Sequence, residues 1–368
     1  MASSPAPQRN HEIRPTGGPG SSTNGRLKLV HSSELATPAL ILDAAAFGHN
    51  LVTMAEALPG DRLRPHVKAH KCTTIAAAQA GVGHTKFTCA TPREVIGMAG
   101  AGLGADLLLA NEVLDTRRLR SMVEAVEAAG ARVTVAIDSD MTLNAAIRGG
   151  VREVVIDIDV GLRRCGCDPD AAGRLAGLAR AAHLTVRGVM GYEGHLMMVL
   201  DRAAQQAQVE ASMALLLRAH RDVGGELVTA GGTGTYDINV WANEIQAGSY
   251  ALMDTHYAQH EFPFLQALFV EATVIARNPK GWAVADCGLK ALGMDHGNPT
   301  IANQSVWFCS DEHITFGPGE GGSMPKVGDR VRITPAHCDP TMALHERIWL
   351  VDPDGDVLDE WVLDLRWW

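Results

Sequence analysis

Residues 64–72 read RPHVKAHKC and hold two lysines and two histidines in a short run. Amines and imidazoles gathered in this way favour a catalytic segment. On an extended chain alternate side chains share one face, so His66 and Lys68 would point the same way while Val67 packs to the other side. A solvated basic loop is the alternative interpretation, because lysine clusters are mostly exposed.

Two glycine-rich runs follow neighbouring predicted strands: residues 230–236 read AGGTGTY and residues 246–250 read QAGSY. Glycines let the backbone approach an anion closely, so that N–H groups and hydroxyls cradle a phosphate. Neither run matches a Walker or dinucleotide fingerprint. In α/β barrels, however, the loops after the seventh and eighth strands commonly bind phosphate. The pair of runs therefore predicts a phosphate site, with turns that serve only the fold as the alternative.

Two further strand ends carry polar groups. Residues 159–166 read DVGLRRCG and would bring a guanidinium, such as that of Arg164, to the same end of the predicted strands as the glycine-rich runs. Arginine suits phenolate or carboxylate recognition because its donors are fixed and its charge is permanent. Residues 191–195 read GYEGH and offer the aromatic ring of Tyr192 and the imidazole of His195. Structural roles for this tyrosine and histidine are the alternative.

Residues 335–340 read PAHCDP and place His337 two positions before Asp339. On an extended chain both side chains would reach one face, with Cys338 turned away. Imidazole plus carboxylate suits Mn²⁺, Zn²⁺ or Mg²⁺, with water at the remaining positions. Spacing alone is a weak metal signal and favours a structural role.

The elements that would position these groups follow a strand–helix rhythm. Short apolar runs alternate with alanine-rich stretches of helical length, which implies parallel strands joined by right-handed crossovers. The predicted fold is α/β, a (β/α)8 TIM-type barrel whose catalytic groups collect at the C-terminal mouth. The predicted barrel strands are 63–67, 86–89, 105–109, 132–137, 153–158, 185–190, 226–229 and 244–247.

The rhythm stops near residue 264, and the alternating apolar segments beyond it predict an antiparallel β domain. We therefore divide the chain into a disordered leader at 1–27, a barrel at 28–260 and a C-terminal β domain at 261–368 that carries the metal motif. The leader is expected to be disordered because it is rich in Ser, Pro, Gly, Asn and Thr. The strand predicted at 37–43 could pack with the β domain instead of the barrel.

Composition narrows the class of protein. A net charge of −10 over 368 residues argues against nucleic-acid binding, since nothing supplies a basic stripe. Seven cysteines without regular spacing favour a reducing cytoplasm over a disulfide framework. No apolar run reaches the length needed to span a membrane.

Taken together, these motifs resemble the fold-type III pyridoxal-phosphate enzymes, which join an alanine-racemase-like barrel to a β domain. The closest resemblance is to the group of D-threonine aldolases and eukaryotic-type D-serine dehydratases. It covers roughly residues 35–368 and rests on 64–71, 231–236 and 335–340. Residues 191–195, GYEGH, and residues 292–297, LGMDHG, look more like a little-characterised branch of the group than its best-known aldolases.

The resemblance implies roles for individual residues. Lys68 would bind the cofactor covalently, whereas Lys71 lies outside the matched role. Arg164 and Tyr192 would lie beside the cofactor ring. His337 and Asp339 resemble the aldolase metal site, because a His-x-Cys pair is more typical of the dehydratases. The remaining residues assigned to cofactor binding are His66, Gly232, Thr233, Gly248, Ser249 and Tyr250.

The implied activity is retro-aldol cleavage of β-hydroxy-D-amino acids to glycine and an aldehyde. It would need pyridoxal 5'-phosphate and a divalent metal, with Mn²⁺ ahead of Mg²⁺ or Zn²⁺. A metal-bound water, His70 or His195 would remove the hydroxyl proton. Dehydration of D-serine, D-threonine or 3-hydroxy-D-aspartate to a 2-oxo acid and ammonia is the main alternative, ahead of racemisation without a metal. The β domain argues against a non-catalytic cofactor-binding protein, and the family implies a homodimer.

Overall fold

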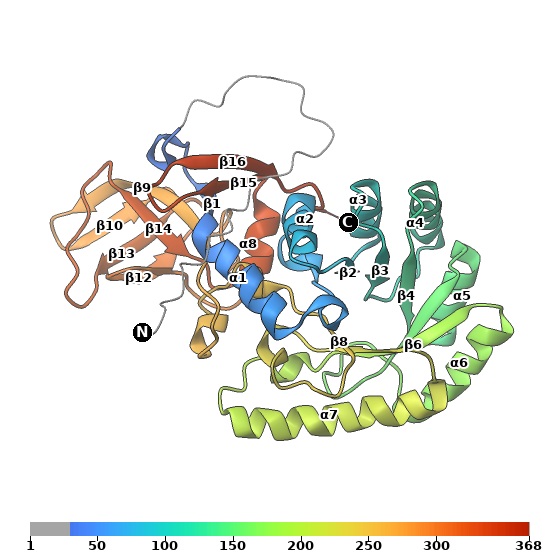
Figure 1. Cartoon of the computed structure of the whole chain (residues 1–368). Coiled ribbons are helices and arrows are strands. Elements are labelled where there is room, and N and C mark those ends of the chain that lie inside the picture. Colours follow the sequence, from blue (N-terminus) through green and yellow to red (C-terminus); the bar gives the residue numbers. More distant parts are fainter. Residues whose placement is uncertain (1–29, 368) are drawn as a thin grey trace, which may run out of the picture.

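The computed structural model describes residues 30–367, so the leader predicted at 1–27 lies outside the described residues. Two sheets organise the described chain: a seven-stranded parallel sheet and a nine-stranded mixed sheet. In Figure 1 the parallel sheet and its helices lie on the right and the mixed sheet lies on the left. No helix among residues 30–367 is both long enough and apolar enough to cross a bilayer.

The parallel sheet forms the wall of the barrel, and its strands pair in sequence order from β2 to β8. Residues 63–66 close the gap between β8 and β2, with parallel bridges from Leu63 to Ile245 and from His66 to Thr88. The segment predicted as the first strand thus forms only two isolated bridges. A continuous strand is not formed because Pro65 has no N–H to donate. The strands are β2 Lys86–Cys89, β3 Asp106–Leu109, β4 Val133–Ile137, β5 Glu153–Asp157, β6 Thr185–Gly191, β7 Leu227–Ala230 and β8 Glu244–Ile245.

Helices connect the barrel strands, and several begin at a side-chain cap. The Thr91 side chain accepts from the Glu94 N–H at the start of α3, and Ser139 and Thr142 form a capping box at the start of α5. The helices are α1 Ala44–Ala57, α2 Thr73–Gly81, α3 Pro92–Gly100, α4 Thr116–Ala128, α5 Asp140–Gly149, α6 Ala172–Ala181 and α7 Arg202–Val223. The 3₁₀ helices are Ser32–Glu34, Gly60–Arg62, Val67–Ala69, Pro169–Ala171, Gly194–Leu196, Thr233–Thr235, Ser249–Ala251 and Tyr257–Gln259.

The second sheet is mixed, where an antiparallel one was expected. Its N-terminal strand β1 (Ala39–Asp43) pairs antiparallel with β9 and parallel with β15. The chain thus starts in the β domain before α1 leads it into the barrel. The other strands are β9 Leu268–Asn278, β10 Trp282–Ala285, β11 Thr300–Ile301, β12 Gln304–Cys309, β13 Ile314–Pro318, β14 Arg330–Thr334, β15 Arg347–Val351 and β16 Val357–Val362.

A short helix, α8 (Cys338–Leu344), interrupts the β domain where an extended chain was expected around the H-x-D motif. His337 is its N-cap residue with extended backbone, and Asp339 lies in its first turn. Pro340 is compatible with this helix because the first turn needs no intrahelical N–H donor. α8 packs against the 3₁₀ helix Val67–Ala69, which brings the β domain onto the barrel mouth.

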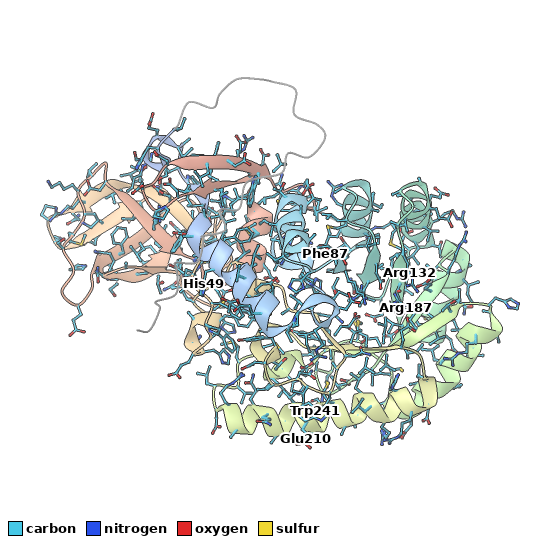
Figure 2. All side chains as sticks on the ribbon, viewed as in Figure 1. His49, Phe87, Arg132, Arg187, Glu210 and Trp241 are labelled. Atoms are coloured by element: carbon cyan, nitrogen blue, oxygen red, sulfur yellow. The ribbon has the colours of Figure 1, made fainter. Side chains whose placement is uncertain are left out.

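Inside the barrel a buried charge network holds the first residues of the RPHVKAHKC segment. Arg64 is fully buried and donates to both oxygens of Glu244 at 2.9 and 3.1 Å, and to Asp106. Arg187, labelled in Figure 2, contacts the same Asp106 at 2.7 Å. Because buried charges are stable only when paired, this network fixes residues 63–66 against their neighbouring strands. His66 and Lys68 are thereby placed above it, at the mouth.

Candidate active site

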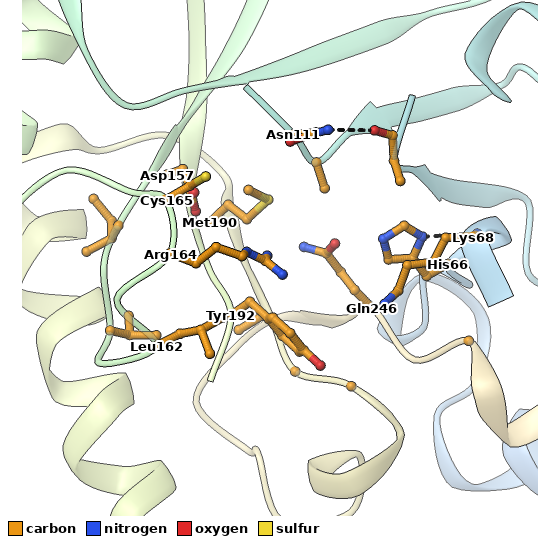
Figure 3. Close-up of a pocket in the computed structure, with 18 of the residues that line it drawn as sticks. His66, Lys68, Asn111, Asp157, Leu162, Arg164, Cys165, Met190, Tyr192 and Gln246 are labelled. Atoms are coloured by element: carbon orange, nitrogen blue, oxygen red, sulfur yellow. Dashed lines mark hydrogen bonds between the residues drawn. The ribbon is translucent and has the colours of Figure 1, made fainter. Parts of the chain in front are cut away.

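A cavity of about 280 Å³ opens at the C-terminal ends of the barrel strands. Figure 3 shows His66, Lys68, Arg164, Tyr192 and Gln246 around it. These side chains come from four separate segments: His66 and Lys68 from one, and the others from the ends of β5, β6 and β8. A barrel assembles a site in this way from distant parts of its sequence. Of the residues predicted from the sequence, those that line the cavity are His66, Lys68, Arg164, Tyr192, Gly232, Thr233, Gly248 and Ser249.

Lys68 lies in the 3₁₀ helix Val67–Ala69 with its amine directed to the cavity. Its side chain is 43% exposed and lines the cavity. Nζ lies 3.4 Å from Oδ2 of Asp339, whose charge raises the pKa of the lysine. His66 shares the same side, as the alternation predicted, and burial together with the Lys68 charge lowers its pKa. A cationic amine therefore stands beside an uncharged imidazole.

Lys71 has a different environment from Lys68. Its amine contacts the carboxylate of the fully buried Glu94, and it does not line the cavity. Glu94 in turn accepts a hydrogen bond from the N–H of Ala90. Lys71 is therefore committed to an ion pair between the start of α2 and helix α3.

The two glycine-rich loops form one wall of the cavity. A Cβ at Gly248 would lie 2.5 Å from the backbone oxygen of His66, so only glycine fits there. Thr233 accepts a hydrogen bond from the N–H of Tyr250 at 3.1 Å, which ties the loop after β7 to the loop after β8. Closely approached backbone with hydroxyls nearby is the setting that phosphate groups require. The cavity wall thus fits the phosphate of pyridoxal phosphate.

The buried side chain of Glu193 holds the loop after β7 in place. It is fully buried and accepts hydrogen bonds from the N–H of Gly231, from Thr235 and from Asn239 at 3.1, 2.9 and 2.8 Å. The Tyr250 side chain is also buried, and its hydroxyl accepts from Gln79 at 3.1 Å. Tyr250 does not line the cavity, although the resemblance implied cofactor contact. Both side chains support the loops rather than face a ligand.

Arg164 and Tyr192 also line the cavity, and the Tyr192 ring lies next to Gly232 of the loop after β7. The guanidinium carbon of Arg164 lies 5.6 Å from the centroid of the Tyr192 ring, within cation–π range. Burial raises the pKa of the Tyr192 phenol. A permanent cation and a flat aromatic face suit a heteroaromatic ring that carries acceptor atoms. The donor set of the cavity therefore fits pyridoxal phosphate at its ring as well as at its phosphate.

The H-x-D motif lies at the rim of this cavity. Asp339 accepts from the Ser249 hydroxyl at 3.2 Å as well as contacting Lys68. Burial alone would raise the pKa of Asp339, but the charges of Lys68 and His337 outweigh it and lower the pKa to about 2. His337 lies 2.7 Å from Asp295. One carboxylate and one imidazole at the rim are a donor set that fits a divalent cation.

The two histidines predicted as bases lie outside the cavity wall. His70 is fully buried, where it accepts from the N–H of Cys72 at 3.2 Å and lies 3.3 Å from Gln79. Burial lowers its pKa to about 4. His195 is exposed, with its ring against Gly161. The structure brings neither imidazole to Lys68.

Several cavity residues were not singled out from the sequence. Asn111 and Glu112 follow β3, Asp157 ends β5, Gln246 follows β8 and Tyr257 lies in the linker to the β domain. The signal that could have found the first four is their position, because a polar residue at a barrel strand's C-terminal end faces the mouth. Burial and the neighbouring Glu112 hold the pKa of Asp157 well above its usual range.

Comparisons with known proteins agree with this geometry. A family model described as the alanine racemase N-terminal domain matches residues 42–255, and one described as a putative serine dehydratase domain matches 267–351. The chain is 33% identical to a D-threonine aldolase from an Arthrobacter species, over 90% of this chain and 92% of the relative. It is 31% identical to a 3-hydroxy-D-aspartate aldolase from Paracoccus denitrificans, over 92% and 94%.

A solved structure shows the same architecture. The crystal structure of D-threonine aldolase from Filomicrobium marinum superposes with a TM-score of 0.84 at 32% identity, and the match covers 91% of this chain and 96% of that one. Barrel, β domain and their order along the chain are therefore shared. The chain belongs to the alanine-racemase-like, fold-type III family of pyridoxal-phosphate enzymes, in the group that contains the D-threonine aldolases.

Proposed function

We propose that this protein is a pyridoxal-phosphate- and divalent-metal-dependent D-threonine aldolase that cleaves β-hydroxy-D-amino acids to glycine and an aldehyde. The observation that carries the proposal is the position of Asp339, whose carboxylate from the β domain lies 3.4 Å from the Lys68 amine at the barrel mouth. The lysine proposed to bind the cofactor and the aspartate proposed to bind the metal are neighbours in space although 271 positions separate them, from 68 to 339. The names of the two aldolase relatives support the same reaction.

The barrel residues would bind the cofactor and orient the substrate. Lys68 would hold it covalently, the loops at Gly232 and Gly248 would hold its phosphate, and Arg164 would lie beside its ring. Electron withdrawal from the bond that breaks at Cα is the chemistry that bound pyridoxal phosphate supplies.

The residues His337 and Asp339 would hold the metal. A divalent cation at this rim would supply Lewis acidity for the β-hydroxyl of the substrate, lowering the pKa of that group. An oxygen ligand such as Asp339 favours Mn²⁺ or Mg²⁺, whereas a cysteine at that position would favour Zn²⁺. Asp339 thus supports Mn²⁺ as the metal, and the two aldolase relatives support aldol cleavage over dehydration.

The proposal gives no catalytic role to the two histidines that were predicted as bases. His70 is enclosed by Cys72 and Gln79, and His195 lies against Gly161 on the exposed side of the following loop. We therefore assign no proton transfer to either histidine. Lys68, whose amine lines the cavity, would be the group that delivers a proton to Cα after the Cα–Cβ bond has broken, which completes glycine.

A product assay tests the function. Purified protein with pyridoxal phosphate and Mn²⁺ is given D-threonine, and glycine and acetaldehyde are the expected products. L-threonine should remain unchanged, and a strong chelator should stop the reaction until Mn²⁺ is restored. Ammonia with a 2-oxo acid would show a dehydratase instead, and chelator-resistant formation of L-allo-threonine, the product of inversion at Cα alone, would show a racemase.

We further propose a homodimer in the cytoplasm. Both proposals rest on the family and on composition. All seven cysteines of the sequence are free in the described residues, which agrees with a reducing compartment. The net charge of −10 supports a small-molecule substrate over a nucleic-acid partner.

A further inference from the structure

Two residues that no role above uses lie beside the H-x-D motif. Asp295 and His296 belong to the loop between β10 and β11, and their ligand atoms and those of His337 all lie within 4.8 Å of one another. By atom type alone, the three side chains could be a three-ligand metal site. The geometry of the contacts decides whether they are.

The loop is built rigidly onto the start of α8. The Gly293 N–H donates to the Thr341 hydroxyl at 2.9 Å, and that hydroxyl donates to the backbone oxygen of His337 at 2.7 Å. Gly293 also forms an antiparallel bridge with His337, and a Cβ at Gly293 would overlap Pro340. Asp295 therefore approaches His337 from a fixed backbone.

His296 cannot share a metal ion with His337. Their rings are stacked, with centroids 4.0 Å apart and only 10° between the planes. An imidazole nitrogen binds a metal in the plane of its ring, at about 2.1 Å. The planes of the two stacked rings run nearly parallel, so no single position lies in both planes. One ion therefore cannot bind a nitrogen of His296 and a nitrogen of His337 in the preferred geometry. His296 also contacts His256, at 4.0 Å between centroids, and acts as a packing wall.

Asp295 decides which nitrogen of His337 is free. Oδ2 of Asp295 lies 2.7 Å from Nδ1 of His337. A carboxylate only accepts hydrogen bonds, so the imidazole proton is on Nδ1 and the lone pair is on Nε2. Carboxylate–histidine pairs of this kind orient metal-binding imidazoles and increase their basicity.

We propose that Asp295 is a positioning residue for the metal centre, holding His337 in the tautomer and orientation in which Nε2 binds the cation, while His296 packs against the ring without binding. This inference rests on the proposed metal role of His337. It assigns a purpose to residues 292–297, the segment that the sequence set apart from the rest of the family pattern.

Metal affinity tests the inference without reference to activity. Mn²⁺ is titrated into chelator-treated, cofactor-bound protein, and free Mn²⁺ is followed by electron paramagnetic resonance. Asp295→Ala should weaken Mn²⁺ binding about 10- to 100-fold, the usual effect of losing such a partner. Asp295→Asn should lose less, because the amide oxygen still accepts from Nδ1. His296→Phe, which keeps a stacked ring, should bind Mn²⁺ like the native chain.

Controls separate the outcomes. Asp354→Ala removes an exposed carboxylate of the same domain and should change nothing, and an unaltered cofactor absorbance shows that each variant is folded. Native affinity in Asp295→Ala would overturn the inference, as would a loss in His296→Phe as large as that in His337→Ala. Loss in Asp295→Ala equal to that in His337→Ala would make Asp295 a direct ligand. If His337→Ala itself binds Mn²⁺ normally, the proposed metal site is wrong.

Discussion

Lys68 and Lys71 lie three positions apart in one segment, but Lys68 lines the cavity whereas Lys71 forms an ion pair with Glu94. Lys68→Ala should remove the visible absorbance of the bound cofactor, because no other amine faces the cavity among its lining residues. Lys71→Ala should keep that absorbance but lower the free energy of unfolding by about 3 kcal/mol, since it leaves the buried Glu94 without its cation. Absorbance spectra and thermal unfolding measure the two effects.

Borohydride reduction followed by peptide mapping provides the check on this assignment. A label on Lys68 agrees with it. A label on Lys71, or a cofactor band that survives in Lys68→Ala, would contradict it.

For single residues, the spacing in the sequence predicted which way side chains point, but it did not predict which side chains are buried. That His66 and Lys68 lie on the same side could be predicted from their spacing, although Lys68 belongs to a 3₁₀ helix and not to the extended chain on which the prediction rested. The enclosure of His70 could not, because it depends on how Gln79 of α2 packs above it. The contact between Asp339 and Lys68 was also beyond pattern analysis, since it arises only when two domains dock.

The loop after β8 offers a test at the scale of an element. Gly248→Ala would force a Cβ to within 2.5 Å of the His66 oxygen, so the phosphate loop or residues 64–66 must move. We expect pyridoxal phosphate to bind at least about 10-fold more weakly, as misplaced positioning groups commonly cause losses of this order or more. Cofactor affinity, measured by fluorescence titration of the apoprotein, is the readout.

Gly177→Ala is the matched control for that change. Gly177 lies inside α6 with nothing within 4 Å of a built Cβ. The substitution should leave cofactor affinity unchanged and raise the free energy of unfolding by about 1 kcal/mol, because alanine favours a helix interior over glycine. Equal cofactor affinity in both variants would refute the role given to Gly248.

Elements with a clear hydrophobic period were predictable, and those set by local exceptions were not. The strands β2 to β8 follow short apolar runs separated by helical stretches, which is a strong pattern. Residues 63–66 also read as a strand, but Pro65 removes a donor and reduces the pairing to bridges. Helix α8 was missed because Pro340 and the short length conceal it, and this changed the expected geometry of His337 and Asp339.

For the molecule as a whole, the site exists only where the two domains meet. The barrel supplies Lys68 and the phosphate loops, while the β domain supplies Asp339 through α8. Strand β1 reinforces the connection, because it comes before the barrel in sequence but pairs with β9 and β15 of the β domain. Both domains could be predicted from the sequence. The structure adds the contact between them, in which α8 of the β domain brings Asp339 to Lys68 of the barrel.

Uncharged histidines are a second property of the whole molecule. Among residues 30–367, burial lowers the pKa of six imidazoles below the ordinary value, and for His70 the folded pKa is about 4. The pKa of Asp157 shifts the other way from those of the histidines. Burial raises it, so the folded carboxyl keeps its proton at higher pH. The six histidines are His66, His70, His84, His256, His260 and His345.

These shifts predict that the protein loses stability in mild acid. Below about pH 6.5 the unfolded chain binds protons on its histidines, whereas folded His70 stays neutral down to about pH 4. The unfolded state therefore takes up more protons across this window, and each fully buried imidazole contributes up to about 1.4 kcal/mol per pH unit. The thermal midpoint should fall steadily from pH 7 to pH 5, and less steeply in His70→Gln, which has one titrating group fewer. A midpoint that is constant or rises over this range would show that these imidazoles are protonated in the folded protein.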